Sequence, residues 1–419
     1  MEDIFDIING FLDDKWKGKY SSSEVITPKE IVADMVNLLP AEVFNKDSRF
    51  LDPAVKSGRF LAEIYRRLMD SQLMVREFPD EQARQKYILD NQLYGFATSA
   101  VAATIARKQL YDDPTALGNI RFTGDKVTKE LIQGAFGDMK FDVVIGNPPY
   151  NRGMDIDFVK MGFDLSTQYT VMITPAKWQT AEADQSIASK MTYGEFRRQL
   201  VPHMSHVVFF PCCKDVFDIY QTDGITYYVL DKEEHDTCVV ENRCKDIAPF
   251  NGRETRPITN AESLLNIGNE IIEYMGAYPK FQFMYLTGNK RFEVWMNTKV
   301  SGYDWYATKG PRYVLSISRL IDNSKGQRYD GEAKCIFESD SRDECESFGT
   351  WIYSKFTRFF LVPNISKLNN IQTNHCFRFV PAPPSGKFDH IYTDQELYDH
   401  FKLPQKYIDV IESVIKERK

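Results

Sequence analysis

Apolar runs and amphipathic segments alternate along the first 235 residues. Residues 49–68 and 91–110 each combine a short apolar strand, a turn with small residues and an amphipathic helix. Strands that alternate with helices in this way are typical of a doubly wound α/β sheet. Further strands are predicted at residues 119–125, 141–145, 168–178, 206–210 and 225–230, and further helices at residues 155–165 and 195–200.

The pattern changes after about residue 231. Short apolar segments are now broken by Asn, Gly, Pro and Ser, as in residues 251–260 and 381–390. The loss of regular alternation indicates a separate and less regular domain. We therefore predict two domains, residues 1–235 and residues 236–419, with a mixed α+β fold for the second. The end of the chain contains two capped helical segments that meet near Pro404.

A helix is predicted to begin at Thr27. This residue is a good N-cap, Pro28 suits the first helical position, and Glu30 completes a capping box. Apolar positions 31, 35, 38 and 39 give the helix one buried face. An ordinary capped helix explains the segment without any further role.

Composition narrows the class of protein. Of 419 residues, 43% are hydrophobic and 26% are charged, as expected for a globular protein. No apolar run approaches 18 residues and the start of the chain is acidic, so we expect a cytoplasmic protein without a membrane segment. Seven cysteines without a Cys-x-x-Cys pair favour reduced thiols, and no metal site is predicted because adjacent cysteines such as Cys212 and Cys213 chelate poorly.

The most informative segment is residues 141–151. Its first five residues predict a buried strand that ends at Gly146. The two prolines that follow fix φ and remove two N–H donors, so the loop presents acceptors. The Asn147 side-chain oxygen and the Pro148 carbonyl can each accept one proton of an NH2 group on a flat ring, while Tyr150 stacks on that ring. Two such acceptors aim the nitrogen lone pair at an electrophile.

Asn147, Pro148, Pro149 and Tyr150 directly after a strand resemble the catalytic loop of gamma-class N6-adenine DNA methyltransferases of restriction-modification systems. The resemblance implies a Rossmann-like, seven-stranded methyltransferase sheet with helices on both faces, plus a C-terminal target-recognition domain. It also implies transfer of a methyl group from S-adenosylmethionine to N6 of a flipped-out adenine in a specific DNA sequence. Methylation of a ribosomal RNA base or of a protein glutamine stays open, because those enzymes carry similar loops.

A second resemblance concerns the cofactor. Residues 52–58 resemble the family's Asp-Pro-Ala-x-Gly-Ser-Gly motif, which implies that Asp52, Pro53, Ala54 and Gly58 bind S-adenosylmethionine. The resemblance also implies that Thr27 lies against the methionine end and that Asn147 contacts the cofactor. Lys56 stands where a glycine is usual, and we expect its side chain to extend outward.

By the same resemblance, the strands predicted near residues 91–98 and 119–125 supply the adenosine end of the cofactor site. An acidic residue usually ends the second strand and binds the ribose hydroxyls, but residues 95–98 contain no acid. The resemblance leaves Phe96 to pack on the cofactor's adenine, and it gives Asp125 the exocyclic amine of that ring. The alternative for Asp125 is a helix N-cap for residues 127–133. These departures from the family keep open a binding module that has lost its chemistry.

The target base needs a second stacking partner. By resemblance, Phe217 covers the other face of the flipped base, and a buried phenylalanine of the sheet edge is the alternative. Lys177 and Trp178 lie in a Pro-containing loop and are candidates to line the same pocket. Core packing is the expected role of Trp178.

The net charge of −7 does not exclude a nucleic-acid partner, because binding depends on where charge lies. Residues 281–330 contain eight Lys or Arg against four Asp or Glu, so double-stranded DNA is the predicted partner and an aromatic core the alternative reading. No nuclease constellation is visible, which favours a separately encoded restriction endonuclease. The aromatic residues of this stretch are Tyr285, Phe292, Trp295, Tyr303, Trp305, Tyr306 and Tyr313, and the candidates to read base edges are Asn364, Lys367, Asn369, Asn370, Gln372 and Asn374.

Overall fold

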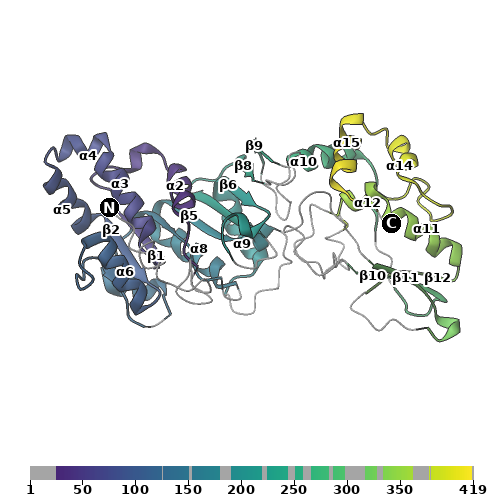
Figure 1. Ribbon diagram of the computed structural model, residues 1–419, viewed down its shortest axis with the longest axis horizontal. Helices are drawn as coiled ribbons and strands as arrows, with labels where there is room; N and C mark the ends of the chain where they lie inside the picture. The colour runs from purple at the N-terminus through teal and green to yellow at the C-terminus, as the bar shows by residue number, and fades with distance from the viewer. Residues whose placement is uncertain are drawn as a thin grey trace. The chain divides into compact units, whose positions relative to one another are not determined.

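The fold is taken from a computed structural model (Figure 1). It describes residues 25–124, 126–150, 153–179, 190–218, 224–243, 251–257, 266–282, 286–297, 317–327, 334–361, 377 and 379–417. The described residues form two compact units. The first comprises those within Met1–Gln221, Ile225–Val240 and Thr255–Asn260, and the second those within Thr222–Gly224, Glu241–Glu254 and Ala261–Lys419.

The first unit is built on a large, mostly parallel sheet. Its strands are β1 (Phe50–Val55), β2 (Leu93–Ala97), β3 (Ile120–Arg121), β4 (Phe141–Gly146), β5 (Ser166–Pro175), β6 (Met204–Phe210), β7 (Ile225–Asp231), β8 (Cys238–Asn242) and β9 (Gly252–Arg256). They are ordered β3-β2-β1-β4-β5-β7-β6-β8-β9, and β7 runs antiparallel to both of its neighbours. The predicted α/β class is therefore confirmed. The sheet is longer than the seven strands predicted, because β8 and β9 extend it, and the third strand is shorter than residues 119–125.

Helices cover both faces of this sheet (Figure 1). Helices α2 (Lys29–Asn37), α3 (Arg59–Asp70) and α6 (Ala100–Tyr111) share one apolar cluster with Val143, Val171 and Ile173. Helix α8 (Met154–Leu165) packs on the opposite face, because its Gly162 lies against the side chains of Val144 and Met172. The remaining helical segments of this unit are α4 (Gln72–Glu77), α5 (Glu81–Asn91), α7 (Lys129–Phe136), α9 (Tyr193–Leu200), η1 (Ala41–Val43), η3 (Ala176–Gln179), η4 (Val201–His203) and η5 (Cys213–Asp215).

The second unit has its own aromatic core. A three-stranded antiparallel sheet, in the order β11-β10-β12, packs with helix α11. Phe337 of β12 stacks on Phe348 of α11 with ring centroids 4.4 Å apart. The elements of this unit are α10 (Asn266–Tyr274), η7 (Met275–Ala277), β10 (Phe292–Asn297), β11 (Ile317–Asp322), η8 (Asn323–Lys325), β12 (Lys334–Ser339), α11 (Arg342–Tyr353), α12 (Lys355–Phe359), α14 (Asp394–His400) and α15 (Gln405–Val414). The domain boundary at residue 235 stays a prediction.

The capped segments expected at the end of the chain are present. Thr393 caps α14 by accepting a hydrogen bond from the Glu396 backbone N–H, and Pro404 precedes α15. Among the described residues, no helix is both long enough and apolar enough to cross a bilayer.

Close packing at Gly95 of β2 gives a test of the fold. A Cβ at this position would lie 2.5 Å from Val55 Cγ2 and 2.8 Å from Ile120 Cδ1. We expect Gly95→Ala to lower the free energy of unfolding by about 1 to 3 kcal/mol, because neighbouring strands must shift. The matched control is Gly134→Ala in α7, where nothing lies within 4 Å. That change should stabilise the helix by up to about 1 kcal/mol, and urea unfolding of both variants measures the difference.

Candidate functional site

Three segments that are far apart in sequence meet at the carboxyl ends of β1 and β4. The first is residues 25–27, here called the strap, the second is the loop between β1 and α3, and the third is Asn147 after β4. They enclose a cavity of about 10 Å³, roughly the space of one water molecule. Five predicted site residues lie together there, namely Thr27, Asp52, Ala54, Gly58 and Asn147. The other lining residues are Ile26, Lys56, Ser57, Arg59 and Phe60.

The Asn147 side chain is fixed from one side. Its Nδ2 donates to Thr27 Oγ1 at 3.1 Å and to the Val25 carbonyl at 3.4 Å. Because a carbonyl can only accept, the nitrogen must face the strap and Oδ1 must face away from it. Oδ1 is buried and has no hydrogen-bond partner among the described residues. An amide with one end anchored and a buried, unsatisfied acceptor at the other is prepared to receive a donor.

The predicted capping role of Thr27 is wrong. Helix α2 begins at Lys29 with Pro28 as its N-cap residue, and no side chain caps it. The Thr27 hydroxyl instead accepts the hydrogen bond from Asn147. The capping pattern in the sequence was misleading because the same hydroxyl can serve either the helix or the loop after β4. In the structure it serves the loop.

Asp52 is a buried carboxylate within β1. It is 2% exposed, and its Oδ1 accepts a hydrogen bond from the Ala54 backbone N–H at 2.9 Å. Burial raises the pKa of Asp52 to about 7, although Ala54 and the charge of Lys56 oppose the shift. Gly146 makes room for this carboxylate, since a Cβ there would lie 2.7 Å from Oδ1. Asp52 thus lies directly beside the residue that precedes Asn147.

Lys56 does not extend outward as expected. It is 7% exposed, and its Nζ donates to the Val25 carbonyl at 3.2 Å. Arg59, the first residue of α3, acts similarly, because its Nη1 donates to the Thr27 carbonyl at 3.0 Å. Lys56 turns inward because the strap offers its ammonium an acceptor inside the site. Both cations therefore hold the strap against the β1–α3 loop.

Helix α3 begins beside these cations. Gly58 precedes it with φ of 79°, a conformation that favours glycine. A Cβ on Gly58 would come within 3.2 Å of the Ala106 backbone, so a glycine is also needed for α3 to approach α6. No side chain caps α3, and the start of the helix carries the positive end of its dipole.

Of the three remaining predicted cofactor residues, Pro53 and Phe96 do not line the cavity. Pro53 is buried within β1, and Phe96 of β2 is fully buried. Asp125 lies outside the described residues. Its alternative role as a helix cap is wrong, because α7 begins at Lys129 and Thr128 Oγ1 caps it by accepting from the Leu131 N–H.

The predicted base-stacking residues contact the same apolar cluster. Tyr150 is half-buried, and its hydroxyl donates to the Ile173 carbonyl of β5 at 3.3 Å. Burial raises the pKa of Tyr150 well above its usual value, so the hydroxyl remains a donor. Phe217 is 3% exposed and Pro148 is buried. Stacking of a base between the two aromatic rings stays a prediction.

The loop after β5 serves the core. The Trp178 ring lies 5.6 Å from Tyr228 and 5.8 Å from Phe196, as its expected packing role requires. The ammonium of Lys177 lies 5.1 Å from the centroid of the Tyr193 ring. Both side chains therefore make contacts with α9 or β7, and their part in a target pocket stays a prediction.

Sequence reasoning missed Arg59 and the Val25 carbonyl. Arg59 carried a usable signal, because a cation in the first turn of a helix is unfavourable next to the helix dipole. Two cations, Lys56 and Arg59, flank the start of α3. The acceptor at Val25 had no signal, since a backbone carbonyl is present at every residue.

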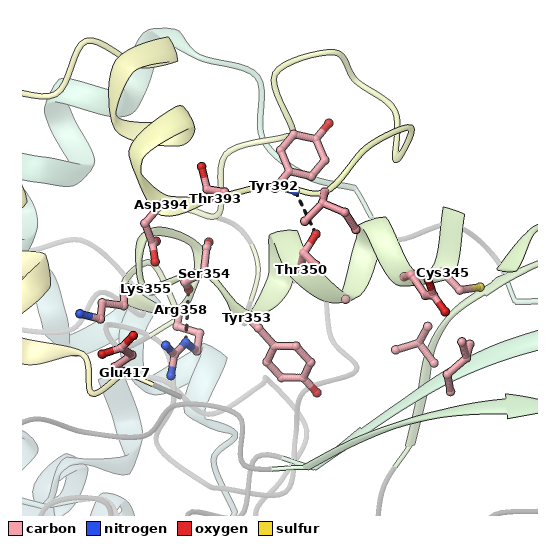
Figure 2. A pocket seen from close by; sticks show the side chains of 15 residues that line it. Cys345, Thr350, Tyr353, Ser354, Lys355, Arg358, Tyr392, Thr393, Asp394 and Glu417 are labelled. Atoms are coloured by element: carbon pink, nitrogen blue, oxygen red, sulfur yellow. Dashed lines mark hydrogen bonds between the residues drawn. The ribbon is translucent and has the colours of Figure 1, made fainter. Parts of the chain in front are cut away.

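A larger cavity of about 820 Å³ lies in the second unit. Figure 2 shows its polar groups on α11, α12 and the segment before α14. Two hydrogen bonds join its lining residues, since Arg358 Nε donates to the Ser354 carbonyl and the Tyr392 N–H donates to Thr350 Oγ1. Lys355 pairs with Glu412.

Other predicted functional residues lie outside the described part of the chain. Among the described residues, no group of three or more His, Cys, Asp or Glu side chains is placed to hold a metal ion. The predicted DNA-contacting residues outside the description are Tyr285, Tyr303, Trp305, Tyr306, Tyr313, Asn364, Lys367, Asn369, Asn370, Gln372 and Asn374. Phe292 is buried in β10, and Trp295 Nε1 donates to Glu293 Oε2 at 2.8 Å.

The raised pKa of Asp52 predicts a pH dependence of stability. A carboxyl with a pKa of about 7 in the folded state and about 4 in the unfolded state favours folding at low pH. This contribution is complete below about pH 4 and is lost as pH rises through about 7. Asp52→Asn should therefore raise the unfolding free energy above pH 7, by an amount on the order of 4 kcal/mol.

Urea unfolding between pH 4 and pH 8 measures this effect. Asp47→Asn removes an exposed carboxylate of the same unit and is the control. If the unfolding free energy of the wild-type protein changed with pH as that of Asp52→Asn does, the raised pKa of Asp52 would be contradicted.

The comparisons with known proteins concern mainly the first unit. Residues 2–178 match the family model described as N-6 DNA Methylase. An adenine-specific methylase of Mycoplasma pneumoniae, described as uncharacterized, is 29% identical, with 38% of this chain and 56% of that protein covered. The type I restriction enzyme MjaVII methylase subunit of Methanocaldococcus jannaschii is also 29% identical, with 42% of this chain and 27% of that protein covered. The chain thus spans only about half, or less, of the length of these relatives.

Among solved structures, the chain is similar to a type I restriction-modification methyltransferase subunit from Streptococcus thermophilus. The TM-score is 0.40 and the identity 15%, with 62% of this chain and 55% of that chain covered. The similarity to this family therefore comes from the sequence match, which contains the strap, the β1–α3 loop and the Asn-Pro-Pro-Tyr loop. Residues 2–178 of this chain are similar to the N-6 DNA methylase family.

Proposed function

We propose that the chain methylates N6 of adenine in DNA with S-adenosylmethionine as the donor. The observation that carries this proposal is the buried Oδ1 of Asn147, which has no partner among the described residues, in a side chain beside Asp52 and the start of α3. A hydrogen-bond acceptor fixed in this way suits an amine on a flat ring, as adenine carries. The family match of residues 2–178 supports the same chemistry.

The residues around the cavity fit the chemistry of the cofactor. Asp52, Thr27 and the backbone at Ala54 and Gly58 offer acceptors and donors, and Gly146 leaves room for the Asp52 carboxylate. These residues would hold the methionine end, and Pro53, Phe96 and Asp125 are proposed for the adenosine end. When bound, S-adenosylmethionine supplies an electrophilic methyl group. The cavity of about 10 Å³ must widen, since small-molecule sites usually measure about 300 to 1,000 Å³.

The role of the Asn-Pro-Pro-Tyr loop is orientation. The lone pair of an aromatic amine is delocalised, so the amine is a weak nucleophile. Asn147 Oδ1 and the Pro148 carbonyl would each accept one amine proton and draw the nitrogen towards tetrahedral geometry. Anchoring of Asn147 Nδ2 on the strap keeps Oδ1 in one position before the substrate arrives. The amine proton that is lost passes to solvent.

The adenine must leave the DNA helix to reach this loop. Flipping a base costs a few kcal/mol, and stacking on an aromatic side chain returns about 1 to 3 kcal/mol per base. Tyr150 and Phe217 are proposed for that stacking. The second unit is proposed to read the DNA sequence. A separately encoded restriction endonuclease is the proposed further partner, by analogy with the methylase subunit of the restriction enzyme named above.

Sequencing of DNA from cells that express the protein tests the proposal. Adenines methylated within one short sequence are the expected result. Asn147→Ala should lower kcat/KM by about 100- to 1,000-fold, because an acceptor that acts on the reacting group is lost. Asn91→Ala is the control, since that asparagine is exposed and its side chain donates to the Tyr87 carbonyl within α5.

Methylation of RNA or of a protein glutamine, with unmodified DNA, would favour the alternatives named from the sequence. An unchanged rate in Asn147→Ala would contradict the role of the loop for any of these substrates.

Tyr150 gives a second test of the site. Tyr150→Phe keeps the ring and removes only the hydrogen bond to Ile173, so most activity should remain. The test DNA carries a target adenine that is mismatched or lies opposite an abasic site. Tyr150→Ala should weaken binding of this DNA by about 5- to 150-fold, because one stacking face is lost. Fluorescence of 2-aminopurine at the target position reports the flipped state. Equal effects of the two substitutions would show that the ring does not stack.

A further inference from the structure

The strap closes the methionine end of the cavity through three donors. Lys56 Nζ and Asn147 Nδ2 both donate to the Val25 carbonyl, and Arg59 Nη1 donates to the Thr27 carbonyl. The enclosed space admits about one water molecule. A cofactor can enter only if some of these hydrogen bonds are exchanged for bonds to the cofactor itself.

The charge around the cavity is positive. Lys56 and Arg59 both line it, and the uncapped start of α3 adds the positive end of a twelve-residue helix. Asp52 is the only carboxylate among the lining residues, and it lies in contact with Gly146 on the other side, towards β4. Two cations and a helix N-terminus form a binding site for a small anion.

The buried acceptor of Asn147 supports a ligand in this space. Asn147 lines the same cavity, and its Oδ1 has no partner among the described residues. A cavity that held only structural contacts would leave an unsatisfied acceptor at a cost of about 1 to 3 kcal/mol. The same ligand would therefore carry a donor for Asn147 or bring one near, and an anion for Lys56 and Arg59.

We infer that Lys56 and Arg59 bind the carboxylate of the cofactor's methionine. On binding, Lys56 gives up its hydrogen bond to the Val25 carbonyl, and Arg59 gives up its hydrogen bond to the Thr27 carbonyl. The inference rests on the proposed function, since it concerns how that cofactor is held. A carboxylate accepts stronger hydrogen bonds from Lys and Arg than a neutral carbonyl does, so the exchange favours the bound state. At the position where a glycine usually lets the cofactor approach the backbone, Lys56 then makes a charged contact with the cofactor.

Calorimetric titration with two ligands tests the inference. The ligands are S-adenosylmethionine and its decarboxylated analogue, which keeps the sulfonium and the amine. The wild-type protein should bind S-adenosylmethionine about 10- to 100-fold more tightly. Lys56→Met and Arg59→Met, which keep much of the side-chain volume, should lower that affinity by a similar factor and leave the affinity for the analogue unchanged.

Two control variants separate charge from structure. Lys56→Arg keeps the cation and should keep the preference for S-adenosylmethionine. Lys46→Met removes a surface cation that pairs with Glu77 and should change neither affinity. Thermal unfolding of each variant checks that the fold is retained.

The outcomes distinguish the inference from the proposed function. Equal losses for both ligands in Lys56→Met and Arg59→Met would assign these residues a structural role and overturn the inference. An unchanged preference in both variants would overturn it as well. Neither of these results affects the proposed reaction. Failure of the wild-type protein to bind S-adenosylmethionine would instead overturn the proposed function, and the inference with it.

Discussion

The anchored amide of Asn147 is the interaction on which the candidate site depends. An asparagine side chain can rotate, and its two ends have opposite hydrogen-bonding character. The strap holds the nitrogen end through Thr27 and the Val25 carbonyl. The oxygen end is therefore set before any substrate arrives, and no reorganisation of this group is needed during the reaction. The neighbouring strands β1 and β4 bring Asp52 to the same point.

Burial and charge complete this arrangement. Asp52 carries a raised pKa because it is buried, while Lys56 and Arg59 donate to carbonyls of the strap. The carboxyl group and the two cations thus line one small space. This arrangement gives the site a polarity that a ligand with both an amine and a carboxylate can match.

Much of the fold could be predicted from the sequence because strand and helix periodicities are local. The strands that carry Asp52 and Asn147 lie where the apolar runs predicted them. The role of Thr27 could not be predicted, since its hydroxyl bonds to Asn147, 120 residues away, instead of capping the next helix. The inward turn of Lys56 was equally hidden, because its acceptor is a carbonyl 31 residues earlier. Strand β8 was missed because its apolar run is only three residues long, and β9 because it contains no large apolar residue.

Most of the bonds that hold the site end on main-chain oxygens. Lys56, Arg59, Asn147 and Tyr150 donate to the carbonyls of Val25, Thr27 and Ile173. A carbonyl remains in place whichever side chain its residue carries. A substitution at position 25 or 173 therefore removes no acceptor from the site, and its effect is on the apolar cluster that both side chains join. A substitution of Lys56, Arg59 or Asn147 removes a donor directly.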